Sequence, residues 1–268
     1  MIFGGIDIGS RTTKVCILEN RKLVSYTIIK TTPKISETAY VAMSELLSKN
    51  GIHLKDISYI VATGYGRINV PFAHKQVTEI SCHALGITFF STNIRTILDM
   101  GGQDLKIIRC DEKGRVLKFI MNDKCAAGVG RFIERIAEIL KIPIESVGPL
   151  SLDSTNPEKI SNYCVIFALE EVLFLLKQGK VINNILAGVL DGFTERIFNM
   201  LNRFGIEKEL AVCGGIAKNI GIVKRLEKML EIPLFIPPEP QIVGAIGAAM
   251  FAKKFYENKE VFENGGIF

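Results

Sequence analysis

The sequence predicts a duplicated α/β fold, in which two similar halves each begin with a β-hairpin. The prediction rests first on a repeated motif: DIGSRTTK begins at Asp7, and DMGGQDLK begins at Asp99. In both copies an apolar, strand-like segment ends at the aspartate, and a lysine follows seven positions later, at Lys14 and Lys106. Repetition within one chain indicates a duplicated structural unit. Alternation of strand-like and helical patterns after each motif is typical of α/β proteins.

The elements of the first half follow from their periodicity. The motif continues into a strand that completes the hairpin and then into a third strand-like run. We next expect a helix at about 36–50, a strand at 57–62 and a second helix at about 79–90. A length of 268 residues suits two domains. The boundary is predicted near residues 91–95, with the first half at 1–93.

The second half, residues 94–268, has a longer helical middle. An apolar stripe from Ile182 to Leu201 is typical of a helix that faces a core. The C-terminal helix could pack across from this half against the first. The other elements expected here are a strand at 210–213, a helix at 217–230, a strand at 234–236 and a helix at 243–256.

The duplicated Asp-x-Gly turns are suited to binding a nucleotide triphosphate with magnesium. Glycine permits close approach of the backbone to phosphate, and the N–H groups of such a turn can bind phosphate oxygens. The aspartate at each strand end can hold a hydrated magnesium ion. A single turn of this kind is a common hairpin device, but two in matched frames favour the nucleotide interpretation. Lys14 and Lys106 could contact phosphate or be ordinary exposed strand residues.

The turns resemble those of the superfamily that contains actin, sugar kinases and heat-shock-chaperone ATPases, whose fold is ribonuclease H-like. That resemblance implies a nucleotide cleft between the two α/β halves. A third element of the superfamily, a Gly-Gly turn that enters a helix near the adenosine, is matched by Gly214 and Gly215, with Lys218 close behind. The Walker A motif is absent, so the chain is not a P-loop enzyme.

Two of the six cysteines, Cys125 and Cys164, differ from the others in their setting. Each precedes a helical pattern, and a helix N-terminus lowers thiol pKa and favours anionic ligands. Cys16, Cys110 and Cys213 lie in strand-like runs, where a buried, inert thiol is expected, and Cys82 lies within a helical pattern. A [4Fe–4S] cluster needs four thiolates, so a two-fold symmetric homodimer is the simplest way for two cysteines per chain to bind one. Taken singly, either cysteine is more readily explained as structural.

Longer motifs give a family resemblance that covers essentially the whole chain. The segment NDKCAAGVGRF around Cys125 is similar to the first cluster-ligand motif of the ATP-dependent activator, or reductase, components of 2-hydroxyacyl-CoA dehydratase and benzoyl-CoA reductase systems. The segment CVIFALEEV from Cys164 resembles the second, although it is more apolar than usual. The segments ATGYGR, ISCHALG, DMGGQD and CGGIAKN also look like this BadF/BadG/BcrA/BcrD-type family.

The resemblance implies a homodimeric iron–sulfur ATPase with ATP or ADP, magnesium and one [4Fe–4S] cluster held by Cys125 and Cys164 of both subunits. It implies that ATP hydrolysis drives one low-potential electron to an iron–sulfur dehydratase or reductase partner. Ferredoxin or flavodoxin would reload the cluster, which should be oxygen-sensitive. The site residues expected are Asp7, Asp99 and Gln103 for magnesium and the attacking water, and Gly9, Ser10, Thr12, Thr13, Lys14, Gly101, Gly102, Asp104, Gly214, Gly215 and Lys218 for the nucleotide.

Other functions compatible with the fold stay open. An N-acetyl-hexosamine-like kinase would need a general-base aspartate, for which Asp123 is available, and a regulatory or chaperone module would lack iron. A double-cubane-cluster reductase is an alternative partner. No roles are assigned to Tyr65, Arg67, Glu170 and Glu171.

Bulk properties exclude two classes of partner. The net charge of +5 is mild and no block of consecutive basic residues occurs, so nucleic acid is not expected. The longest apolar run, 165–176, contains two glutamates and is too short to span a membrane. The N-terminus does not read as a signal peptide, so we expect a cytoplasmic protein.

Overall fold

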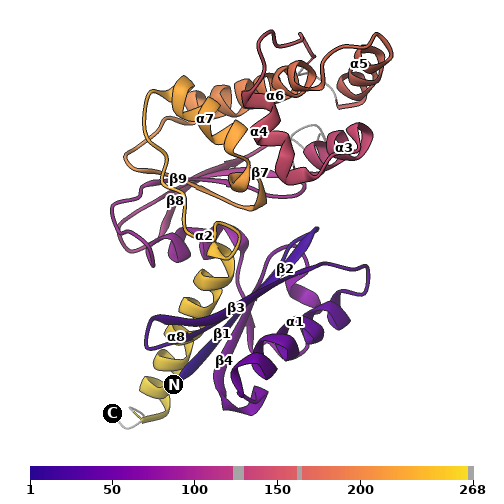
Figure 1. Cartoon of the computed structure of the whole chain (residues 1–268). Helices are drawn as coiled ribbons and strands as arrows, with labels where there is room; N and C mark the ends of the chain where they lie inside the picture. Colours follow the sequence, from indigo (N-terminus) through magenta and orange to yellow (C-terminus); the bar gives the residue numbers. More distant parts are fainter. Residues whose placement is uncertain (123–129, 162–164, 265–268) are drawn as a thin grey trace. The chain divides into compact units, whose positions relative to one another are not determined.

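The computed structural model describes residues 1–122, 130–161 and 165–264, and its contacts divide the chain into two compact units (Figure 1). The first unit comprises Met1–Ile97, Ile108–Lys118 and the chain from Gln241 onward. The second comprises Leu98–Ile107 and Phe119–Pro240. The C-terminal segment therefore belongs with the N-terminal part of the chain, and the two units alternate along the sequence.

The first unit is built on a five-stranded sheet of order β3-β2-β1-β4-β5. Strand β1 pairs antiparallel with β2 and parallel with β4, as a hairpin followed by a strand–helix–strand connection requires. The strands are β1 (Ile2–Ile8), β2 (Thr12–Glu19), β3 (Lys22–Lys30), β4 (Ile57–Thr63) and β5 (Lys75–Gln76).

Helices cover both faces of this sheet, with α1 (Ile35–Asn50) on one side and α8 (Val243–Asn264) on the other (Figure 1). Successive side chains of a strand point to opposite faces. Ile6 and Ile8 accordingly join the core beneath α1, whereas Phe3 packs with α8. The same alternation places Asp7 on the α8 face. Helix α2 (Glu79–Ile87) also packs against α8.

The second unit contains most of a four-stranded sheet of order β8-β7-β6-β9 and a set of helices that share one core. The strands are β6 (Thr96–Met100), β7 (Leu105–Cys110), β8 (Val116–Met121) and β9 (Leu210–Cys213). The helices are α3 (Gly130–Leu140), α4 (Val147–Leu152), α5 (Val165–Lys177), α6 (Ile182–Phe204) and α7 (Ile220–Leu230). Short 3₁₀ turns are η1 (Leu54–Asp56), η2 (Arg67–Asn69), η4 (Ile144–Ser146) and η5 (Gly215–Lys218). The predicted apolar stripe of α6 is buried in this core.

Four predicted elements differ from the structure. The C-terminal helix, expected at 243–256, extends from Val243 to Asn264. The strand expected at 234–236 is a single bridge between Phe235 and Ala211. The helix expected from 217 begins at Ile220, because the Asn219 side chain accepts a hydrogen bond from the Ile222 amide and caps the helix there. The helix expected to reach residue 90 ends at Ile87. Among the described residues, no helix combines the length and apolar character needed to cross a bilayer.

Candidate functional site

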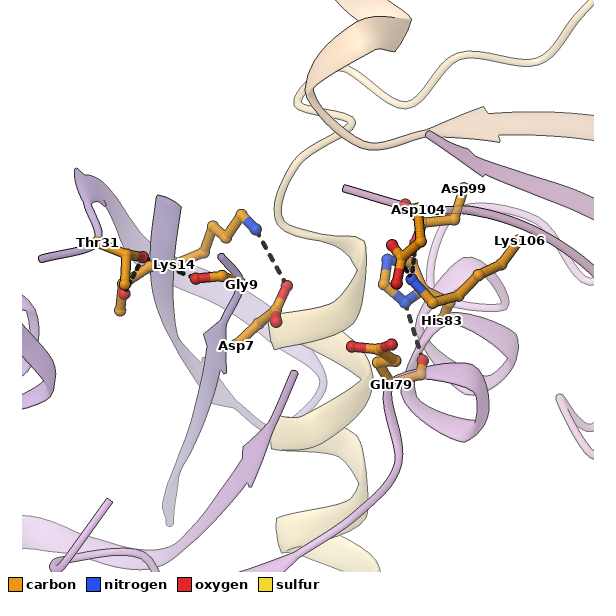
Figure 2. A network of polar contacts seen from close by, with 10 residues as sticks. Asp7, Gly9, Lys14, Thr31, Glu79, His83, Asp99, Asp104 and Lys106 are labelled. Carbon is orange, nitrogen blue, oxygen red and sulfur yellow. Dashed lines mark hydrogen bonds and ion pairs between the residues drawn. The ribbon is translucent and has the colours of Figure 1, made fainter. Parts of the chain in front are cut away.

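The first Asp-x-Gly turn joins β1 to β2. Asp7 lies opposite Lys14 in the hairpin, and the lysine Nζ is 3.4 Å from Asp7 Oδ2. The Gly9 amide closes the turn by donating to the Thr12 carbonyl at 3.1 Å. The Thr31 hydroxyl, just after the end of β3, donates to the Gly9 carbonyl at 2.9 Å (Figure 2). The first turn is thus held by one hydrogen bond to the start of β2 and by another to the residue that follows β3.

The second turn, between β6 and β7, repeats this geometry. Lys106 Nζ is 3.5 Å from Asp99 Oδ2, and the Gly101 amide donates to the Asp104 carbonyl at 3.0 Å. The turn also carries a second ion pair, because Asp104 Oδ1 lies 2.6 Å from the same Nζ (Figure 2). The repeat detected in the sequence is therefore a repeat in three dimensions.

The structure excludes one of the two alternatives for Lys14 and Lys106, and their contact with phosphate stays a prediction. Neither is an ordinary exposed strand residue: the Lys106 side chain is only 4% exposed and that of Lys14 only 12%. Buried ammonium and carboxylate groups are tolerated when they are paired, because each offsets the desolvation of the other. Lys14 and Lys106 therefore balance the charge of the aspartates at the strand ends.

Gly64, to which the sequence alone assigned no role, packs closely against the first turn. Gly64 follows β4 with φ +84°, and a Cβ placed on it would overlap Asp7 Oδ1 and lie 2.5 Å from the Ile8 carbonyl oxygen. Gly214 follows β9 with φ +86°, and its Cβ would overlap the Met100 carbonyl and lie 2.9 Å from Asp99 Oδ1. Each aspartate is thus backed by a glycine at the end of another strand of its sheet. The signal in the sequence was the matching position of the two glycines after their strands.

The other predicted nucleotide residues are distributed unevenly. Ser10 and Thr12 are half-buried beside Gly9, and Thr13 is buried with its hydroxyl 2.9 Å from that of Thr31. In the second turn Gly101 and Gly102 are half-buried, and Gln103 is exposed. Gly215 and Lys218 lie exposed on η5, where Lys218 Nζ pairs with Glu239 Oε2 at 2.7 Å.

The second turn is also bonded to the start of α3. The Gly130 amide donates to the Gly101 carbonyl at 3.2 Å, and the Arg131 amide donates to the Gly102 carbonyl at 3.1 Å. These are the first two residues of the helix, whose amides have no acceptor within their own helix. The backbone of the second turn therefore anchors the helix that follows the Cys125 segment.

Comparison with known proteins decides the family. A model of the BadF/BadG/BcrA/BcrD ATPase family matches residues 5–252, which is nearly the whole chain. The chain belongs to this ATPase family. The activator of lactoyl-CoA dehydratase from Anaerotignum propionicum is 41% identical over 255 residues, covering 95% of this chain and 98% of that protein. One of the subunits of benzoyl-CoA reductase from Thauera aromatica is 30% identical, with 93% and 92% coverage.

Solved structures agree with the family and confirm the predicted fold. The activator of 2-hydroxyisocaproyl-CoA dehydratase from Clostridium difficile, solved with bound ADPNP, has a TM-score of 0.91 at 37% identity and covers 97% of each chain. A sugar kinase of the ROK family, the glucokinase of Streptomyces griseus, has a TM-score of 0.60 at 11% identity, covering 95% of this chain and all of that one. The second likeness shows the fold alone, and it places this ATPase family member among actin-like and sugar-kinase-like α/β proteins.

The two proposed cluster ligands of this ATPase family member, Cys125 and Cys164, lie outside the described residues, as does Asp123. The four cysteines within the described part, Cys16, Cys82, Cys110 and Cys213, are buried. Burial raises the pKa of the Cys82 thiol to about 12 and that of Cys110 to about 11, and it raises the pKa values of Cys16 and Cys213 as well. These thiols do not suit a cluster, which binds thiolate. Within the same described part, no group of three or more His, Cys, Asp or Glu side chains could hold a metal ion.

Four residues without assigned roles now have positions. Tyr65 is exposed, and Arg67 donates to the Gly64 carbonyl at 3.0 Å, so it buttresses the turn behind Asp7. Glu170 is exposed, whereas Glu171 accepts a hydrogen bond from the Ser161 amide at 2.6 Å. Glu171 thereby ties α5 to the segment before Cys164.

Proposed function

We propose that this protein is an ATP-dependent activator that couples ATP hydrolysis to delivery of one low-potential electron to a 2-hydroxyacyl-CoA dehydratase or related reductase. The observation that carries the proposal is the similarity to the lactoyl-CoA dehydratase activator, which extends over 95% of this chain and 98% of that protein. The bound ADPNP in the structure of the 2-hydroxyisocaproyl-CoA dehydratase activator supports the nucleotide.

The duplicated turns are proposed to bind the phosphates of ATP. The Gly9 and Gly101 amides already donate hydrogen bonds within their turns. We therefore propose that the two glycines let the phosphates approach the backbone closely and that the residues after them face the phosphates. Asp7 and Asp99 suit magnesium, because both are buried carboxylates at strand ends, where hard oxygen ligands are needed. Bound magnesium would neutralise charge on the phosphate oxygens.

The chain's own part in hydrolysis is positioning and charge balance. Phosphoryl transfer depends mainly on orientation and electrostatic stabilisation. Lys14 and Lys106 hold the aspartates in place, and Gly64 and Gly214 keep the space behind them free of side chains. Gln103, exposed on the second turn, is proposed to orient the attacking water, and Gly214, Gly215 and Lys218 are proposed to adjoin the adenosine.

Cys125 and Cys164 are proposed to hold a [4Fe–4S] cluster together with the same cysteines of a second copy. Such a cluster supplies one-electron transfer when bound. The buried, high-pKa state of the four other cysteines supports this assignment, because it leaves these two as the thiols suited to ligation.

The surface of α5 supports the homodimer. Ile166, Phe167, Leu173 and Phe174 are 44–64% exposed and follow one stripe of the helix. Contiguous exposed apolar surface marks an interaction site. Because α5 starts directly after Cys164, a second copy that shares the cluster would lie close to this stripe.

The partner is proposed to be a dehydratase, with a reductase as the second candidate. The likeness to the benzoyl-CoA reductase subunit favours that second candidate. A ferredoxin or flavodoxin is the proposed electron donor, and a double-cubane-cluster protein is an alternative acceptor.

Anaerobic purification tests the proposal. Iron, acid-labile sulfide and the visible spectrum would be measured per dimer, together with ATP hydrolysis. We expect about four irons per dimer. They should be lost in Cys125→Ser and in Cys164→Ser, retained in the matched control Cys16→Ala, and bleached by air.

Colourless, iron-free protein after anaerobic reconstitution, with ATP binding intact, would overturn the activator assignment. ATP consumption in proportion to a sugar acceptor would then favour the kinase function.

A further inference from the structure

The carbonyl group of Gly9 is held from outside its turn by a residue to which the proposed function assigns no part. We infer that Thr31 is a positioning residue for ATP binding: its hydroxyl holds the Gly9 carbonyl so that the next amide, that of Ser10, is presented to a phosphate oxygen. The inference rests on the proposed ATPase function and adds to it a residue outside the repeated motif. Thr31 and the turn that it contacts lie in the first unit.

The direction of each hydrogen bond follows from the chemistry of the groups. The Thr31 hydroxyl lies 2.9 Å from the Gly9 carbonyl oxygen and 2.9 Å from the Thr13 hydroxyl. A carbonyl oxygen only accepts, and a hydroxyl has a single proton to donate. Thr31 therefore donates to Gly9, and Thr13 donates to Thr31. Thr13, which is fully buried, has no proton left for a phosphate, so it acts through Thr31.

The planarity of the peptide bond turns this contact into a direction for the next amide. In a trans peptide, such as the one from Gly9 to Ser10, the C=O and the following N–H point in opposite directions. The Gly9 carbonyl points toward Thr31, so the Ser10 N–H points away from it. Figure 2 shows the Thr31 contact on the side of Gly9 opposite the ion pair of Asp7 and Lys14. Within residues 1–122, 130–161 and 165–264 the Ser10 amide has no acceptor, which suits it to a ligand.

The second turn has the same arrangement with a different donor. Gly101 occupies the place of Gly9 in the repeat, and its carbonyl accepts from the Gly130 amide at 3.2 Å. The following amide, that of Gly102, likewise has no acceptor in the described part of the chain. A hydroxyl in one turn and a helix amide in the other thus have the same effect, which is to fix the direction of this peptide.

A purely structural link between the end of β3 and the hairpin would not need the Thr31 hydroxyl. Such a link exists already, because the Thr31 amide donates to the Arg11 carbonyl at 2.9 Å. The side chain adds a second bond, and that bond goes to the carbonyl of the peptide that carries the Ser10 amide. Without it the carbonyl could rotate toward the phosphates, where its partial negative charge would repel their oxygens.

The test measures the dissociation constant of ADPNP with magnesium by isothermal titration calorimetry. Thr31→Val keeps the shape of the side chain and removes the hydroxyl, so it should weaken binding by roughly 3- to 10-fold, with little change in kcat at saturating ATP. Thr31→Ser keeps the hydroxyl and should stay close to wild type. The matched control is Thr32→Val, because the Thr32 hydroxyl bonds instead to that of Thr38, at 2.7 Å, and to the Lys34 carbonyl.

A double-mutant cycle tests the route from Thr13 through Thr31. Thr13→Val should weaken ADPNP binding in the wild-type background. It should have no further effect in Thr31→Val, because the bond between the two hydroxyls is already lost. An equal effect of Thr13→Val in both backgrounds would overturn this route.

The possible outcomes separate this inference from the function on which it rests. Wild-type protein that binds neither ADPNP nor ADP would count against the proposed ATPase. Wild-type binding of ADPNP, with Thr31→Val no weaker than Thr32→Val, would overturn the role of Thr31 alone. If circular dichroism shows that Thr31→Val does not fold, Thr13→Val decides, and wild-type affinity in that variant would overturn the inference.

Discussion

At the scale of single residues, Gly64 and Gly214 are the positions behind the two Asp-x-Gly turns where a side chain cannot be placed without strain and overlap. Both have φ values near +85°, which a residue with a side chain adopts only with strain, and both closely back the aspartates proposed to bind magnesium. Two separate costs, one of backbone conformation and one of steric overlap, therefore fall on any substitution. The chain also contains a glycine, Gly179, that carries only the first of these costs, so the two can be measured separately.

We predict that Gly214→Ala destabilises the protein more than Gly179→Ala. Gly179 has φ +73°, and no atom of a described residue beyond its chain neighbours lies within 4 Å of its Cβ position, so its substitution carries the backbone cost of about 1–2 kcal/mol alone. Gly214→Ala adds the overlap with Met100 and Asp99 and should also abolish ATP hydrolysis. Urea unfolding and ATPase assays measure both effects. Equal unfolding midpoints for the two variants would show that the close approach at Gly214 does not matter.

At the scale of elements, the hydrogen bonds between the second turn and α3 connect the proposed phosphate site to the Cys125 segment. Arg131→Pro removes the amide that donates to Gly102, and proline is tolerated in the first turn of a helix. We predict that Arg131→Pro still hydrolyses ATP. In the wild-type protein a chelator should remove iron at different rates from the ATP-bound and ADP-bound states, and this difference in rate should become smaller in Arg131→Pro. Arg131→Ala keeps the amide and serves as the control. An unchanged difference in Arg131→Pro would rule out this connection.

Helix α5 gives a second prediction at this scale. Phe174→Glu places a charge on the exposed apolar stripe, so it should weaken the homodimer by roughly 10- to 100-fold in Kd. Analytical ultracentrifugation of the anaerobic protein measures the change. Val41→Glu is the control, because Val41 is 56% exposed on α1 and Phe174 is 59% exposed. A dimer that survives Phe174→Glu as well as Val41→Glu would place the interface elsewhere.

At the scale of the whole molecule, the six cysteines should differ in how readily their thiols react with an alkylating reagent. Burial raises the pKa values of Cys16, Cys82, Cys110 and Cys213, so their thiolate forms are scarce near pH 8. We predict that iodoacetamide labels Cys125 and Cys164 in native, cluster-free protein and all six after denaturation, as mass spectrometry can count. Rapid native labelling of Cys82 or Cys110 would contradict the buried state described here.

The fold could be predicted from the sequence because it depends on local patterns that occur twice. The spacing from Asp7 to Lys14 and from Asp99 to Lys106 specified two hairpins, and the structure pairs both lysines with their aspartates. The matching positions of Gly64 and Gly214 after their strands are visible in the sequence, but the closeness of Gly64 to Asp7 arises only when β4 pairs with β1. The hydrogen bond from Thr31 to Gly9 depends likewise on the pairing of β3 with β2. The cluster ligands stay a prediction.

The interleaving of the two units has a consequence for how the protein is made. The sheet of the first unit is encoded early, but α8, which covers one of its faces, follows the whole of the second unit in the chain. While a ribosome translates the intervening residues, Phe3, Cys16, Leu18 and Val61 lack the helix that buries them. An uncovered apolar sheet face is prone to aggregation during synthesis. The nascent chain is therefore a natural client for chaperones until α8 emerges and completes the first unit.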